Sequence, residues 1–251
     1  MNLADFAFGT ASVGSRIDAR KFEQLADLAC AAGVTRFDCA PQYGRGLAMH
    51  FVARYLKARP QHPARVTTKL GRMPVADAKS LAIVLAQGEW RQALQLLRTP
   101  AACAADFSVE NLTRSLTVSR SVLPVDRISH VFIHSSPGPV LHGAAGDFLR
   151  QECASQWSVG SAEPHAGDLA WLEQDRPGTW AVQASAEQVL SQPALAGFRG
   201  ELWINSIIRY SRASGQSLRD TMLRLNEARP DRRVLVIGFN HARLFDDFAA
   251  I

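Results

Sequence analysis

The sequence has no uninterrupted apolar run of about 18 residues, the length that a membrane-spanning helix needs. Its first residues include the acidic Asp5 and lack a basic segment followed by an apolar one, which is the pattern of a secretory signal. These absences argue against a membrane partner and predict a cytoplasmic protein.

Cysteine is also scarce, with four residues in a chain of 251. Zinc sites use cysteines in close pairs, and small secreted domains use them at high density for disulfides. The wide spacing of Cys30, Cys39, Cys103 and Cys153 matches neither pattern. We therefore expect reduced, buried thiols and no metal centre.

No run of basic residues is present, although Lys and Arg (28) outnumber Asp and Glu (23) and give a net charge of +5. Nucleic-acid-binding proteins concentrate their basic residues on one face or in one segment. The dispersed charge here predicts no nucleic-acid partner. Of the few lysines, Lys69 alone lies in an apolar run.

The apolar residues are arranged in short runs that alternate with segments of helical spacing. About eight such runs are rich in β-branched and aromatic residues, as expected for βα units around a parallel sheet. A chain of about 250 residues without a linker suits one closed (β/α)8 barrel, an α/β fold, as a single domain over residues 1–251. The expected strands are 6–10, 34–40, 66–71, 130–135, 158–162, 179–184, 202–208 and 234–239.

Several helices have recognisable ends. The clearest starts near Asp18 and ends before Gly33, and another starts at the capping residue Ser108. The long connection 72–107 contains apolar residues at helical spacing, which predicts a helical insertion after the third strand. A last helix is expected over 241–250, followed by a short C-terminus.

An open doubly wound sheet is the competing topology, and it normally has a glycine-rich fingerprint after its first strand. No such fingerprint follows residues 6–10 here. Gly44 and Gly46 come after the second expected strand and lack a third glycine, so a tight turn is the simpler interpretation. The barrel is therefore favoured.

Ionisable residues end three consecutive expected strands: Asp38, Lys69 and His134. Each alone is more often structural, but barrel enzymes place their chemistry at these strand ends, where neighbouring strands are about 4.8 Å apart. Such a cluster suits proton transfer to a carbonyl oxygen, with the nearby Tyr43 as the acid. We expect Lys69 to lower the pKa of the phenol from about 10, and neutral His134 to orient the carbonyl.

No side chain supplies hydride, so this chemistry requires a nicotinamide cofactor. The motifs FDCAPQYG, TTKLG and FIHSS resemble the catalytic tetrad of the aldo-keto reductase superfamily. The segments FGTASVGS and AAGVTRFDCAPQYGRGL are similar to the branch related to sugar and pyridoxal dehydrogenases. The resemblance implies an NADP(H)-dependent enzyme that reduces an aldehyde or ketone, or oxidises the alcohol, with NAD(H) as an alternative. Its catalytic residues are Asp38, Tyr43, Lys69 and His134.

The resemblance also implies a set of cofactor-binding residues. Gln183 in AVQAS and Ser161 in SVGSA match the residues that hold the nicotinamide carboxamide, with Ala162 as the alternative to Ser161. Arg243 matches an arginine that meets the 2′-phosphate of NADPH, which the planar guanidinium suits. The aromatic residue that stacks on nicotinamide has no clear counterpart. The full expected set is Thr10, Ser161, Gln183, Ser206, Gly238, Asn240, Arg243 and Asp247.

Two other functions fit parts of this pattern. Lys69 at a strand end also suits a Schiff-base aldolase, although the adjacent Asp38 favours a charged, non-nucleophilic lysine. A barrel that binds NADP(H) with little turnover, as a sensor or assembly protein, is the alternative from outside enzymology. The sequence leaves the physiological substrate, the reaction direction and the choice between monomer and homo-oligomer open.

Overall fold

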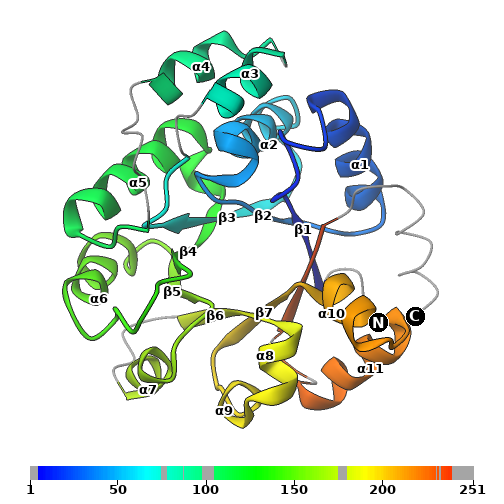
Figure 1. The fold of residues 1–251 in the computed structure, drawn as a ribbon, viewed down its shortest axis with the longest axis vertical. Coiled ribbons are helices and arrows are strands. Elements are labelled where there is room, and N and C mark those ends of the chain that lie inside the picture. Colours follow the sequence, from blue (N-terminus) through cyan, green and yellow to red (C-terminus); the bar gives the residue numbers. More distant parts are fainter. Residues whose placement is uncertain are drawn as a thin grey trace.

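A computed structural model describes residues 5–74, 78–86, 88–97, 105–174, 180–229, 231 and 233–238. Eight parallel strands close into a barrel in sequence order, and helices surround it (Figure 1). This confirms the predicted (β/α)8 barrel. The strands are β1 (Phe6–Gly9), β2 (Arg36–Asp38), β3 (Arg65–Leu70), β4 (Ile128–His134), β5 (Ser158–Ala162), β6 (Trp180–Ser185), β7 (Glu201–Asn205) and β8 (Arg233–Ile237).

The helices follow the strands in the expected alternation. The predicted insertion after β3 is present as two helices that project at the edge of the ring (Figure 1). The helices are α1 (Ala19–Ala31), α2 (Leu47–Lys57), α3 (Ala78–Ala86), α4 (Trp90–Leu97), α5 (Val109–Val122), α6 (Ala144–Phe148), α7 (Ala166–Gln174), α8 (Ala186–Ser191), α9 (Pro193–Ala196), α10 (Ile207–Ser214) and α11 (Leu218–Ala228), with short helices η2 (Tyr43–Gly46), η3 (Val125–Arg127) and η4 (Leu149–Cys153).

Local side-chain chemistry fixes the helix starts that the sequence indicated. The Asp18 carboxylate accepts a hydrogen bond from the Lys21 backbone N–H at 2.8 Å, which caps α1. Ser108 caps α5 in the same way, through the Asn111 N–H at 3.3 Å. The predicted final helix, 241–250, lies outside the described residues.

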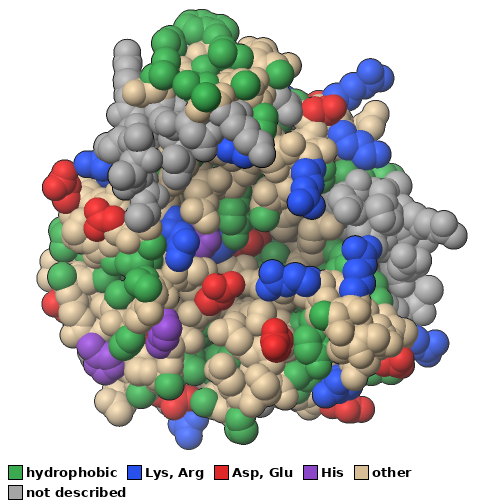
Figure 2. All heavy atoms as spheres, in the orientation of Figure 1, with side chains coloured by type: hydrophobic (Ala, Val, Ile, Leu, Met, Phe, Trp, Pro, Cys, Tyr) green, Lys and Arg blue, Asp and Glu red, His purple; other side chains and the backbone are tan. Residues whose placement is uncertain are grey.

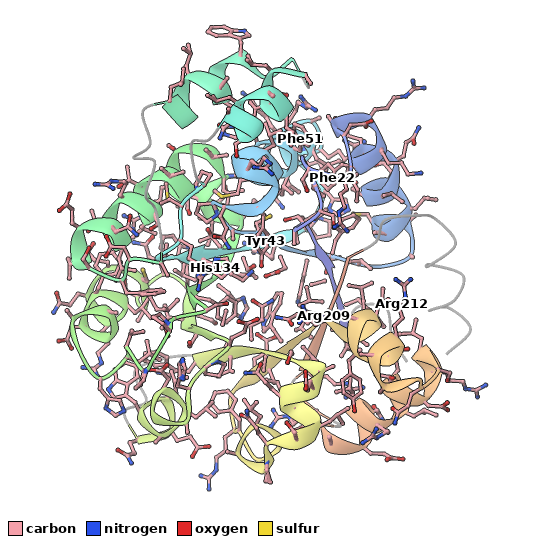
Figure 3. All side chains as sticks on the ribbon, in the orientation of Figure 1. Phe22, Tyr43, Phe51, His134, Arg209 and Arg212 are labelled. Carbon is pink, nitrogen blue, oxygen red and sulfur yellow. The ribbon has the colours of Figure 1, made fainter. Side chains whose placement is uncertain are left out.

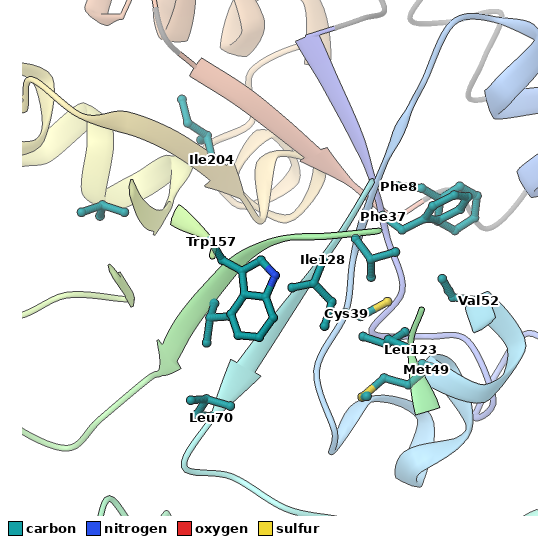
Figure 4. Close-up of a cluster of buried hydrophobic side chains, with 14 of the residues drawn as sticks. Phe8, Phe37, Cys39, Met49, Val52, Leu70, Leu123, Ile128, Trp157 and Ile204 are labelled. Carbon is teal, nitrogen blue, oxygen red and sulfur yellow. The ribbon is translucent and has the colours of Figure 1, made fainter. Parts of the chain in front are cut away.

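Side-chain alternation along the strands separates two apolar layers. One cluster fills the barrel interior: Ala7, Phe132, Ala162, Ala181, Trp203, Val234 and Val236. The intervening residues, such as Ile133 and Val182, belong to the larger layer between strands and helices, part of which Figure 4 shows. Because successive strand residues face opposite sides, membership of a layer tells which way each neighbour points.

Two strands end earlier than the sequence suggested. β2 covers only Arg36–Asp38, and β7 stops at Asn205 instead of continuing to residue 208. Ser206 adopts a left-handed conformation with φ 58°, which breaks the strand, and the apolar Ile207 and Ile208 then begin α10. An apolar run alone does not distinguish a strand from a buried helix start.

The lower half of the barrel interior contains a polar contact between β4 and β7. The His130 Nε2 atom lies 2.6 Å from the Glu201 Oε2 atom, and the Trp203 indole donates to the same oxygen at 3.2 Å. Burial alone would raise the pKa of Glu201, but the hydrogen bond and charge of His130 lower it overall. The pair is therefore a partly buried contact that depends on an ionised carboxylate.

Among the described residues, no helix is long and apolar enough to cross a membrane. Cys39 and Cys153 are buried free thiols, and Cys30 is a partly buried one, whereas Cys103 lies outside the described part of the chain.

Candidate active site

The ends of β2 and β3 bring Asp38 and Lys69 together. The Lys69 ammonium lies 2.6 Å from the Asp38 carboxylate, and the two side chains are 1% and 4% exposed. Thr67 donates a further hydrogen bond to that carboxylate at 2.9 Å. Burial alone would lower the pKa of Lys69, but Asp38 and then Tyr43 raise it overall, so the amine stays charged.

Tyr43 lies directly above this ion pair, on the short helix η2 that follows β2. The Lys69 Nζ atom is 4.7 Å from the centre of the tyrosine ring. Gly44 follows with φ 55°, and a Cβ there would lie 1.7 Å from the Val13 carbonyl oxygen, so only glycine fits this turn. The turn therefore sets the position of the phenol.

The pKa of Tyr43 differs from the predicted direction. Burial raises it to about 12, and the ammonium of Lys69 only partly opposes that rise. Lys69 does lower the pKa as expected, but the prediction was wrong for the net effect, because a sequence does not show how strongly the phenol is desolvated. A phenol held protonated at neutral pH is a proton donor rather than a phenolate.

His134 ends β4 on the other side of Tyr43. The two rings lie 5.6 Å apart, centre to centre, and are nearly perpendicular (Figure 3). The pKa of His134 is well below its usual value because of burial, then the charges of Lys69 and Arg72. The imidazole is thus neutral at physiological pH, and its Nε2 atom lies 3.4 Å from the Gln42 amide nitrogen.

Arg72 holds the end of β4 in place. Its guanidinium donates to the carbonyl oxygens of His134, at 3.1 Å, and Ser135, at 2.5 Å. A guanidinium offers several donors in a fixed plane, so it fixes two consecutive peptide groups at once. Arg72 therefore both orients the strand end and places a positive charge beside the imidazole.

Left-handed backbone is concentrated at this end of the barrel. Each of the four non-glycine residues with positive φ in the described chain directly follows Tyr43–Gly44 or the last residue of a strand. They are Arg45 (φ 59°), Ser135 (φ 43°), Glu163 (φ 57°) and Ser206 (φ 58°). Such conformations are costly and gather at functional sites, which agrees with placing the site at this end.

A cavity of about 310 Å³ opens beside Tyr43. The segment after β3 contributes part of its wall through Met73, Pro74 and Ser80. Trp90 on α4 does not line this cavity and is 58% exposed. The lining residues are Ala11, Gln42, Tyr43, Gly44, Arg45, Met73, Pro74 and Ser80.

A second cavity, of about 360 Å³, lies beyond the ends of β6 and β7. Figure 3 shows that Arg209, one of its lining residues, is closer to the barrel centre than Arg212 on the same helix, α10. Basic side chains on the face shown in Figure 2 are spaced apart rather than gathered in one patch. The lining residues are Ser185, Glu187, Ser206, Arg209, Tyr210, Ala213 and Ser214.

The residues expected to bind the cofactor carboxamide point in different directions. Gln183 is 1% exposed and faces the barrel interior beside Trp203, and neither amide atom has a hydrogen-bond partner in the described chain. Ser161 is in register with Ile133 and Val182, whose side chains belong to the outer layer. Ser161 therefore faces the helices, and its neighbour Ala162, the alternative expected from the sequence, faces the interior.

The remaining expected cofactor residues are less closely grouped. Thr10 is fully buried, and its hydroxyl donates a hydrogen bond to the Asp38 backbone carbonyl at 2.8 Å. The hydroxyl proton is therefore used within the protein. Ser206 lines the second cavity, and Gly238 is exposed just after β8. Asn240, Arg243 and Asp247 lie outside the described residues.

The fold and the site together define a barrel with Asp38, Tyr43, Lys69 and His134 gathered at its mouth. Comparison with known proteins identifies the protein class. The model of the Aldo/keto reductase family matches residues 5–150, more than half of the chain. The chain therefore belongs to this family of oxidoreductases, whose members generally use nicotinamide cofactors and small carbonyl substrates. A comparison with curated proteins found no match.

Solved structures show the same fold at low sequence identity. A protein from Pseudomonas aeruginosa assigned to the aldo-keto reductases is 17% identical, with a TM-score of 0.66 over 98% of this chain and 88% of its own. The holo form of an aldo-keto reductase from Bacillus halodurans is 15% identical, with a TM-score of 0.63 over 98% and 87%.

Three residues near the site were not singled out in the sequence: Gln42, Arg72 and Asn205. Asn205 ends the apolar run LWIN, so a polar residue at the end of the seventh strand was a usable signal. Arg72 acts through backbone carbonyls, and nothing in the sequence indicates such contacts.

Proposed function

We propose that the protein is an NADP(H)-dependent oxidoreductase that reduces a small aldehyde or ketone, or oxidises the corresponding alcohol, in the cytoplasm. The observation that carries this proposal is the buried Lys69–Asp38 ion pair beneath the Tyr43 ring, with neutral His134 beside it. The cofactor, when bound, supplies or accepts the hydride.

Tyr43 is the proton donor in reduction. A substrate carbonyl oxygen gains negative charge during reduction, so a proton must reach it from a group that remains protonated until then. The raised pKa of Tyr43, about 12, keeps the proton on the phenol in the free enzyme. The charged Lys69 then stabilises the phenolate that forms as the proton leaves, because the ammonium lies against the ring.

His134 orients the carbonyl. A neutral imidazole donates a hydrogen bond without competing with Tyr43 as a stronger acid. Its position at right angles to the phenol ring lets both groups approach one oxygen atom from two sides. The cavity lined by Tyr43 and Gln42 provides the space for the substrate.

The interior residues fit a nicotinamide cofactor. The buried amide of Gln183 has both its donor and its acceptor without partners in the described chain, which a carboxamide group would satisfy. The cavity beyond β6 and β7, with Arg209 and three serine hydroxyls, suits the cofactor phosphates. We assign the 2′-phosphate to Arg243 on the family resemblance alone.

The experiment is a fluorescence titration of the purified protein with NADPH and NADH, followed by a panel of aldehydes that includes pyridoxal and small sugars. Tight NADPH binding with carbonyl-dependent oxidation supports the proposal. NADPH binding without turnover of any carbonyl contradicts it and favours the sensor or assembly alternative.

A further inference from the structure

We infer that Asn205, at the end of β7, binds the carboxamide of the nicotinamide cofactor together with Gln183. The family resemblance assigns this role to Gln183 and to a residue of the fifth strand, and to no residue of the seventh. The inference rests on the proposed cofactor, and it names a binding residue that the resemblance does not.

The barrel register places the two amides on one face. Gln183 is directly opposite Trp203, and Trp203 belongs to the interior cluster. Asn205 comes two residues after Trp203 on the same strand, so its side chain also faces the interior. Diagonal neighbours on adjacent strands have their Cα atoms about 7–8 Å apart. At this spacing, two amide side chains can both form hydrogen bonds to a small group that lies between them.

Both amides have buried atoms that lack partners. They are the Gln183 Nε2 and Oε1 atoms and the Asn205 Oδ1 atom, none of which has a hydrogen-bond partner among the described residues. Buried polar atoms are normally paired, and unpaired ones at a functional site indicate a missing ligand. One donor and two acceptors are the complement of a primary carboxamide, which has one carbonyl oxygen and two N–H groups.

The fifth strand does not supply this group. In the upper half of β5, the interior positions are Gly160 and Ala162, which have no polar side chain, while Ser161 faces the outer layer. Asn205 on β7 provides the polar side chain that β5 lacks. The left-handed conformation of Ser206 ends the strand directly after Asn205, so the amide lies at the mouth of the barrel. Ser206, the residue after Asn205, lines the second cavity together with Arg209, and this cavity would hold the rest of the cofactor.

The test compares two cofactors that differ only at the carboxamide. In the 3-acetylpyridine analogue of NADP⁺, a methyl group replaces the NH₂, which removes the N–H donors. Calorimetric titration of the wild-type protein with both cofactors gives a ratio of dissociation constants, and we expect NADP⁺ to bind about tenfold more tightly, a loss typical of one or two hydrogen bonds. In Asn205→Leu this ratio falls to about twofold, since the acceptor has been removed.

Two further variants separate the hydrogen bond from the fold. Asn205→Asp keeps an acceptor oxygen, so it retains most of the preference for NADP⁺. Gln192→Leu removes an exposed amide at the C-terminal end of α8, the end that points away from β6, and retains the full ratio. Circular dichroism of each variant confirms that it is folded, and if Asn205→Leu is not folded, Asn205→Ala, which also removes the acceptor, takes its place with the same expected fall in the ratio.

The outcomes distinguish this inference from the proposed function. A ratio in Asn205→Leu equal to that of the wild type overturns the role of Asn205 and leaves the cofactor proposal standing. A wild-type protein that binds neither cofactor overturns both.

Discussion

The Lys69 ammonium and the Asp38 carboxylate form an ion pair at 2.6 Å, in which neither side chain is more than 4% exposed. Removing one partner of such a pair leaves a buried charge without compensation, which costs about 3–5 kcal/mol of folding free energy. The pair is therefore a structural element as well as the support of Tyr43.

Lys69→Met tests both roles. We expect turnover to fall by at least about 100-fold, because the phenolate loses its stabilising charge, and the free energy of unfolding to fall by about 3–5 kcal/mol, because Asp38 is left alone. Denaturant unfolding and steady-state kinetics measure these effects. The double variant Asp38→Asn with Lys69→Met is expected to recover part of the stability and none of the activity. Additive stability losses in the double variant would show that the two charges do not interact.

Arg72 predicts a shift in the pH profile. Its charge is among the causes that hold the pKa of His134 down, after burial and Lys69, while Asp38 and Tyr43 are the other titratable groups at this site. In Arg72→Leu the pKa of His134 rises toward its usual value, so the protonated, inactive form appears at higher pH. In steady-state kinetics, the acidic limb of the profile of kcat against pH therefore shifts to higher pH.

Arg72→Lys is the matched control for that shift, because it keeps the positive charge. Its acidic limb stays near that of the wild type, although the weaker grip on the His134 and Ser135 carbonyls lowers kcat. Superimposable profiles for the wild type and Arg72→Leu would show that the guanidinium does not affect His134.

The His130–Glu201 contact predicts that part of the free energy of unfolding is lost at acidic pH. Because the pKa of Glu201 is lower in the folded protein than in the unfolded chain, its contribution is present above the unfolded pKa, near 4.3, and is lost as pH falls through the folded pKa. Glu201→Gln is expected to lower the free energy of unfolding by about 1–3 kcal/mol at pH 7. Urea unfolding from pH 7 to pH 3 should show the two proteins converging, and a constant difference would exclude the linkage.

Arg243→Ala addresses the choice of cofactor. If the guanidinium meets the 2′-phosphate, the variant loses affinity for NADPH by about tenfold or more and leaves the affinity for NADH nearly unchanged. Parallel fluorescence titrations give both constants. Equal losses for the two cofactors would remove Arg243 from the phosphate site.

The barrel and the convergence of Asp38, Lys69 and His134 could be predicted from the sequence because both follow from periodic patterns. Apolar runs mark the strands, and in a parallel barrel all strand ends meet at one face, so polar residues at those ends must come together. The caps at Asp18 and Ser108 were predictable for the same local reason.

Other features depend on register and burial, which the sequence does not show. A shift of one residue along β5 exchanges Ser161 for Ala162 at the interior, because neighbouring side chains face opposite sides. The pKa of Tyr43 rises rather than falls, because burial outweighs the lysine charge. The unpaired Oδ1 atom of Asn205, and its place near Gln183, are seen only once β6 and β7 are aligned in the structure.

Tyr43→Phe removes the proposed proton donor and keeps the ring against Lys69, so it tests the proposed chemistry at its centre. Calorimetry and kinetics on the same preparation should show NADPH binding with a wild-type dissociation constant and carbonyl reduction slowed by about 100-fold to 10,000-fold, the contribution typical of a general acid. Reduction at the wild-type rate by the folded, cofactor-binding variant would contradict the assignment of Tyr43 as the proton donor.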